Sequence, residues 1–117
     1  MQLEDRGFVV VPGPVPIECL ADLQDAYEIA VSLATAEDFR HGTTTDRVTD
    51  FVNRGEMFES LYIFPPLLDA CARIIGGPFK LSSFVARTLR PRMPAQEVHV
   101  DVQRNSDDFP LVGFILM

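Results

Sequence analysis

The chain has 117 residues, of which 47% are hydrophobic and 23% charged, so it is expected to form one globular domain rather than a disordered segment. Its formal net charge of −7 argues against a nucleic-acid partner, because phosphate binding needs clustered Lys and Arg. The two cysteines, Cys19 and Cys71, are expected to be buried thiols, and without a basic leader or a membrane-spanning apolar run we expect a cytoplasmic protein with no membrane partner.

The first part of the chain, about residues 14–78, is expected to be mainly helical. An apolar run at 7–11 precedes it and predicts a short strand closed by a Pro-Gly-Pro turn. Apolar residues at helical spacing then predict a helix from Pro16 to about Thr35. Periodicity fades over 37–54, which predicts a loop or an irregular segment.

Two further helices are expected before a change to strands. The first is short and covers about 56–64, and the second runs from Pro65 to a stop formed by Gly76, Gly77 and Pro78. The remaining part, about residues 79–117, is expected to be rich in strands, which are predicted at 79–90, 96–103 and 111–117. Helices followed by strands, without βαβ alternation, indicate an α+β or mainly β fold.

The stretch 96–102 contains the strongest candidate functional residues. Its three valines share one face of the predicted strand, whereas His99 and Asp101 share the other. An imidazole and a carboxylate two residues apart supply two of the three ligands of the facial triad found in non-haem Fe(II) oxygenases. The same pattern also fits an exposed polar face joined by a salt link of little energetic value, because His-x-Asp is a weak motif by itself.

An ordered set of features, spread over most of the chain, gives this pair a context. In chain order they are the opening Gly7-Phe8-Val9-Val10-Val11-Pro12-Gly13 before a Pro-started helix, Leu67-Leu68, Ile74-Ile75-Gly76-Gly77-Pro78, Pro91, Gln96, His99-Val100-Asp101 and the apolar run 111–117. With them, the chain resembles the N-terminal half of a phytanoyl-CoA dioxygenase family member, in the Fe(II)/2-oxoglutarate-dependent dioxygenase superfamily.

The resemblance implies a fold, a chemistry and roles for residues. The fold would be N-terminal helices followed by the first strands of a double-stranded β-helix (jelly roll), incomplete, with residues 1–117 as the N-terminal portion of a single dioxygenase-like domain. His99 and Asp101 would bind Fe(II), and 2-oxoglutarate and O₂ would serve as co-substrates in the hydroxylation of a small-molecule substrate. Gln96 would be a pocket residue for the cofactor, although it shares the face of the valines and also fits a surface amide. Arg87 and Thr88 could reach a pocket, but the sequence does not decide which of them faces inward.

The chain departs from the family pattern in its second half. The family's distal His and its basic residue for 2-oxoglutarate have no match before Met117, and His41, the other histidine, lies in a segment expected to be a loop and solvated. We therefore expect a fragment that is inactive alone and that binds Fe(II) weakly.

Two other classes of protein stay open. The chain could be a non-catalytic interaction module derived from the same fold, with an open sheet edge that favours self-association. It could also be an unrelated small metal-binding α+β domain.

Overall fold

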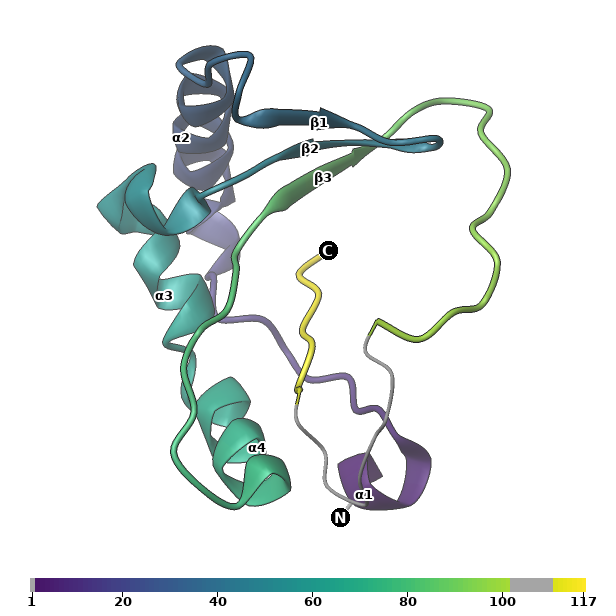
Figure 1. Cartoon of the computed structure of the whole chain (residues 1–117). Helices are drawn as coiled ribbons and strands as arrows, with labels where there is room; N and C mark the ends of the chain where they lie inside the picture. Colours follow the sequence, from purple (N-terminus) through teal and green to yellow (C-terminus); the bar gives the residue numbers. More distant parts are fainter. Residues whose placement is uncertain (1, 102–110) are drawn as a thin grey trace.

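The computed structural model describes residues 2–101 and 111–117, and it shows a mixed architecture of helices and one three-stranded antiparallel sheet (Figure 1). The helices are α1 (Gln2–Arg6), α2 (Leu20–Ser32), α3 (Glu59–Tyr62) and α4 (Pro65–Ile75), the strands are β1 (Phe39–His41), β2 (Thr45–Val48) and β3 (Ala86–Leu89), and the 3-10 turns are η1 (Ile17–Cys19), η2 (Phe51–Asn53) and η3 (Glu56–Phe58).

The sheet is built around a short hairpin. Its order is β1-β2-β3, and β2 pairs with both neighbours in antiparallel register. The turn between β1 and β2 is closed by a 2.8 Å hydrogen bond from the Gly42 N–H to the Thr45 carbonyl. A Cβ at Gly42 would lie 3.0 Å from that same carbonyl oxygen, so glycine fits this close approach better than a larger residue would.

The core lies between α2 and one face of the sheet. Its buried hydrophobic residues are Ala30, Val48, Phe51, Phe58 and Leu61. The ring of Phe51 lies at its centre, 5.7 Å from the ring of Tyr27, 5.0 Å from that of Phe58 and 6.5 Å from that of Phe84. The segment 111–117 reaches this cluster through Phe114, whose ring stacks on Phe84 at 5.6 Å, and it lies near the middle of the molecule in Figure 1.

The helices after residue 14 agree well with the sequence, whereas α1 was not predicted. The helix expected from Pro16 is present as η1 followed by α2, and the helix expected from Pro65 is α4, with proline in its first turn. Gly76 follows α4 with φ 68°, the left-handed conformation that terminates helices and that glycine adopts without strain. No helix in the described part of the chain is long and apolar enough to cross a membrane.

The strands differ from the sequence predictions in two ways. The segment 37–54, expected to be a loop, contains the β1–β2 hairpin, which pairs polar residues rather than an alternating apolar pattern. Conversely, 7–11 is not a strand, and the strand expected over 79–90 is restricted to β3. These predictions relied on apolar residues, their spacing and nearby turn residues along the chain, whereas a strand also needs a neighbour for its backbone hydrogen bonds.

The strands expected at the end of the chain are also not seen as such. Residues 96–101 form no strand, and the segment after β3 leaves the sheet in a wide loop (Figure 1). Residues 111–117 form no strand either, so the run expected at an open sheet edge does not pair with the described sheet, whose outer strands are β1 and β3. The rest of the predicted His-bearing strand and the following polar residues lie outside the described residues.

Candidate metal centre

His99 and Asp101 lie on the loop that follows β3, and their side chains approach each other. His99 Nε2 is 3.5 Å from Asp101 Oδ1, and the two side chains are 56% and 74% exposed. The pair is therefore open to solvent and to any ion that solvent carries. Both groups are ligands that divalent first-row metals accept.

The backbone around the pair fixes how His99 presents its ring. Its Nδ1 is 2.9 Å from the carbonyl oxygen of Glu97. A carbonyl oxygen can only accept, so Nδ1 must carry the proton of this hydrogen bond. In neutral histidine, Nε2 then holds the free lone pair, and it faces Asp101. A backbone carbonyl on the other ring nitrogen is a common way to orient a metal-binding imidazole.

Two arrangements can bring Nε2 this close to a carboxylate oxygen on an exposed surface: an ordinary polar contact and a shared metal ion. At 3.5 Å the separation is longer than the 2.7–3.2 Å usual for an N–H···O bond. Two ligands that each lie about 2.1 Å from one ion are separated by about 3–4 Å, depending on the angle at the ion. A separation of 3.5 Å is therefore open to both arrangements, an exposed polar contact and two ligands of one ion.

The pair is not a complete triad within the described residues. Among them, no group of three or more His, Cys, Asp and Glu side chains could hold a metal ion. Gln96 is exposed, and its side chain makes no hydrogen bond in the part of the chain that the structure describes.

The sheet settles the orientation of two residues that the sequence left open. The hydroxyl of Thr88 is 3.2 Å from the hydroxyl of Tyr27 on α2, so Thr88 faces the helix. Its neighbour Arg87 therefore points to the opposite face of the sheet.

A second His–carboxylate pair lies on the hairpin and was missed from the sequence. His41 on β1 is directly opposite Asp46 on β2, and its Nδ1 is 3.0 Å from Asp46 Oδ1. This distance is normal for a direct hydrogen bond, which accounts for the contact without a metal. Only the register of the hairpin reveals the pair, because the two residues carry no recognisable spacing in the sequence.

Two titratable groups elsewhere have shifted pKa values. The backbone N–H of Thr35, the guanidinium of Arg54 and the Thr35 hydroxyl all bind the Asp38 carboxylate and lower its pKa. Burial raises the pKa of the Cys71 thiol. Cys19, expected to be buried as well, is exposed at the start of α2. Asp38 and Arg54 join the hairpin to the turn that follows it, which is a structural role.

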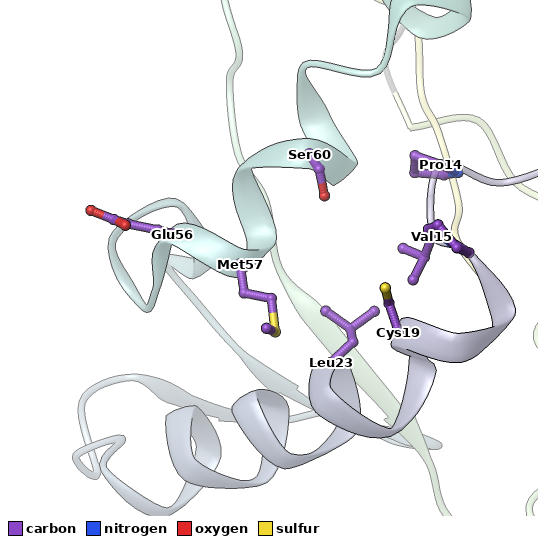
Figure 2. Close-up of a pocket in the computed structure, with 8 residues that line it drawn as sticks. Pro14, Val15, Cys19, Leu23, Glu56, Met57 and Ser60 are labelled. Carbon is purple, nitrogen blue, oxygen red and sulfur yellow. The ribbon is translucent and has the colours of Figure 1, made fainter.

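The cavity shown in Figure 2 has a volume of about 390 Å³ and lies between the start of α2 and the η3–α3 segment. Its lining is Pro14, Val15, Pro16, Cys19, Leu23, Glu56, Met57 and Ser60. The Glu56 carboxylate is turned away from it, so the side chains that face the cavity are mostly apolar (Figure 2). It contains neither member of the His99–Asp101 pair and has no set of metal ligands.

The chain matches no family model, and neither the curated proteins nor the solved structures contain a significant match to it.

Proposed function

We propose that the chain is part of an Fe(II)/2-oxoglutarate-dependent oxygenase of the phytanoyl-CoA dioxygenase family, with His99 and Asp101 as two of the three iron ligands. One observation carries the proposal. The hydrogen bond to the Glu97 carbonyl places the proton of His99 on Nδ1, which leaves Nε2 as the nitrogen able to bind a metal, 3.5 Å from a carboxylate oxygen of Asp101, a separation that two ligands of one divalent ion can have.

The layers of the molecule are compatible with a jelly roll. α2 packs against one face of the three-stranded sheet, and none of the described helices lies over the other face (Figure 1). In a jelly roll, that second face would turn toward the interior, where the substrate binds. The three strands would then be the first part of a larger sheet, and the two ligands would follow on the next segment of the chain.

The residues of this chain would bind and orient the groups that react. His99 and Asp101 would hold Fe(II), and the Glu97 carbonyl would keep the imidazole in the tautomer that binds metal. Iron and 2-oxoglutarate, when bound, would supply the oxidising chemistry that hydroxylates a small-molecule substrate. Gln96, three residues before His99, stays a proposed contact for the cofactor. Because the described residues supply two ligands, we propose that this chain alone does not turn over 2-oxoglutarate.

Titration of the purified chain with Mn(II), a redox-stable substitute for Fe(II), tests the proposal. We expect weak binding to one site, lost in both His99→Ala and Asp101→Asn and retained in the matched control His41→Ala. The control is suitable because His41 is the only other histidine and also lies beside a carboxylate. Equal affinity for Mn(II) in the wild-type chain and in His99→Ala would overturn the proposal. Turnover of 2-oxoglutarate by the chain alone would overturn the claim that it is inactive.

A second candidate function is an interaction module, and the exposed apolar side chains favour it. Val98, Ile115 and Met117 are among many large hydrophobic residues that are exposed, and β3 has an outer edge that pairs with no described strand. Such an edge can pair with a strand of a second copy. Sedimentation of the chain at increasing concentration tests this candidate: a dimer supports it, and a monomer throughout contradicts it.

A further inference from the structure

Three arginines form one row across the sheet. Arg47 in the central strand is directly opposite Arg40 on β1 and directly opposite Arg87 on β3. Residues that face each other across antiparallel strands point to the same face, with Cβ atoms about 5 Å apart. The sequence hides this arginine row, because its members are spread over 48 positions and only the register brings them together.

The arginine row lies on the face of the sheet that turns away from α2. The alternate residues Phe39, Val48 and Ala86 pack on the core beneath α2. Side chains alternate along a strand, so the arginines between them point to the other side. This is the face that the proposed function places toward the interior of the jelly roll.

Nothing in the described chain neutralises the arginine row. Neither Arg47 nor Arg87 forms an ion pair or a side-chain hydrogen bond within the described residues, and Arg47 Nε is buried without a partner. Arg40 donates to the carbonyls of Glu37 and Phe39, which carry no net charge. Like charges directly opposite each other destabilise a sheet, and an unpaired buried donor adds to that cost. In a protein with a net charge of −7, this concentration of positive charge indicates a ligand rather than a general surface property.

We propose that the arginine row binds the anionic group, a carboxylate or a phosphate, of the small-molecule substrate. This proposal rests on the proposed function, because the anion is taken to be part of the oxygenase substrate. It adds the chemical class of that substrate. Guanidinium groups suit this task because their planar array of donors matches the oxygens of carboxylate and phosphate in two-point contacts. A bound anion would relieve the repulsion along the row.

Isothermal titration of the full chain with inorganic pyrophosphate, in metal-free buffer, tests the site. Each lost charge-assisted contact should weaken binding about tenfold or more, so we expect this loss in Arg47→Gln and in Arg87→Gln. Arg87 is exposed, so its variant is expected to keep the fold even if the Arg47 variant does not. The matched control is Arg73→Gln, because Arg73 is an exposed arginine on α4 that pairs with Asp69 at 2.9 Å.

The outcomes separate this proposal from the one on the metal. Pyrophosphate binding that weakens in the row variants and not in Arg73→Gln supports the site. No binding, or equal binding in all variants, overturns it. Binding of 2-oxoglutarate at the row, tighter than pyrophosphate and in competition with it, would assign the row to the co-substrate and also overturn it. The pyrophosphate titration contains no metal, so its result does not depend on the metal centre. If His99→Ala loses Mn(II) binding and keeps pyrophosphate binding, the two sites are independent.

Discussion

Phe51 is the side chain at the centre of the hydrophobic core. It is 3% exposed, and it contacts the rings of Tyr27, Phe58 and Phe84, which come from α2, η3 and the segment before β3. Arg54 also lies over the ring, 5.9 Å from its centroid. Phe51→Ala would leave a cavity where four parts of the chain meet, so we expect it to weaken all of these contacts at once.

The expected loss follows from the size of the side chain and from its neighbours. Replacing a buried Phe by Ala costs about 3–5 kcal/mol, and a domain of this size is stabilised by about 5–15 kcal/mol in total. With a urea dependence of about 2 kcal/mol per M, the unfolding midpoint should fall by about 2 M. Phe51→Leu keeps most of the volume and loses chiefly the ring–ring contacts, so about 1–2 kcal/mol is expected.

Urea unfolding followed by circular dichroism measures both variants. Phe8→Ala is the matched control, because Phe8 is 58% exposed and its described ring contact is with Arg6, at 5.3 Å. We expect the control to shift the midpoint little. If Phe51→Ala shifts it no more than Phe8→Ala does, the position of the core described above is wrong. Phe51→Leu keeps the comparison informative if Phe51→Ala does not fold.

Three further predictions concern single groups. Gly76→Ala should destabilise the chain by about 1 kcal/mol in urea unfolding, because φ is 68° there although a Cβ meets no atom; an unchanged midpoint would contradict it. The pKa of Asp38 is lowered in the folded chain, so its contribution to stability is present above the ordinary pKa and is lost as pH falls through the folded value. Asp38→Asn should therefore be less stable than the wild-type chain at neutral pH and should lose less stability as the pH falls. Stability curves that run parallel over this pH range would contradict the prediction. The exposed Cys19 should react with a disulfide reagent well before Cys71, whose pKa is raised by burial, and the reverse order, assigned with Cys→Ser variants, would disprove the assignment.

The helices could be read from the sequence because their signals are local. Proline at the start of α4 and Gly76 at its end are sufficient to place that helix. The hairpin could not, since Arg40, His41 and Arg47 gave no apolar alternation. Its strands are held by backbone pairing and by a glycine turn, and neither of these leaves a periodic pattern of hydrophobic residues.

The candidate site could be predicted from the sequence only in part. Spacing could place His99 near Asp101, although the strand that was expected to hold them is a loop in the described residues. The hydrogen bond to the Glu97 carbonyl, which sets the tautomer, depends on the path of the backbone and has no signature in residue types. The arginine row likewise depends on register, which contacts between distant segments decide.

The most direct test of the account is the effect of Mn(II) on the two histidine rings in NMR spectra of the full chain. The chain contains two histidines, each beside a carboxylate, with separations of 3.5 Å at His99 and 3.0 Å at His41. A paramagnetic ion broadens signals close to it, so substoichiometric Mn(II) should broaden the His99 ring signals and leave those of His41 sharp. Equal broadening of both rings, or of neither, would contradict a metal centre at His99 and Asp101.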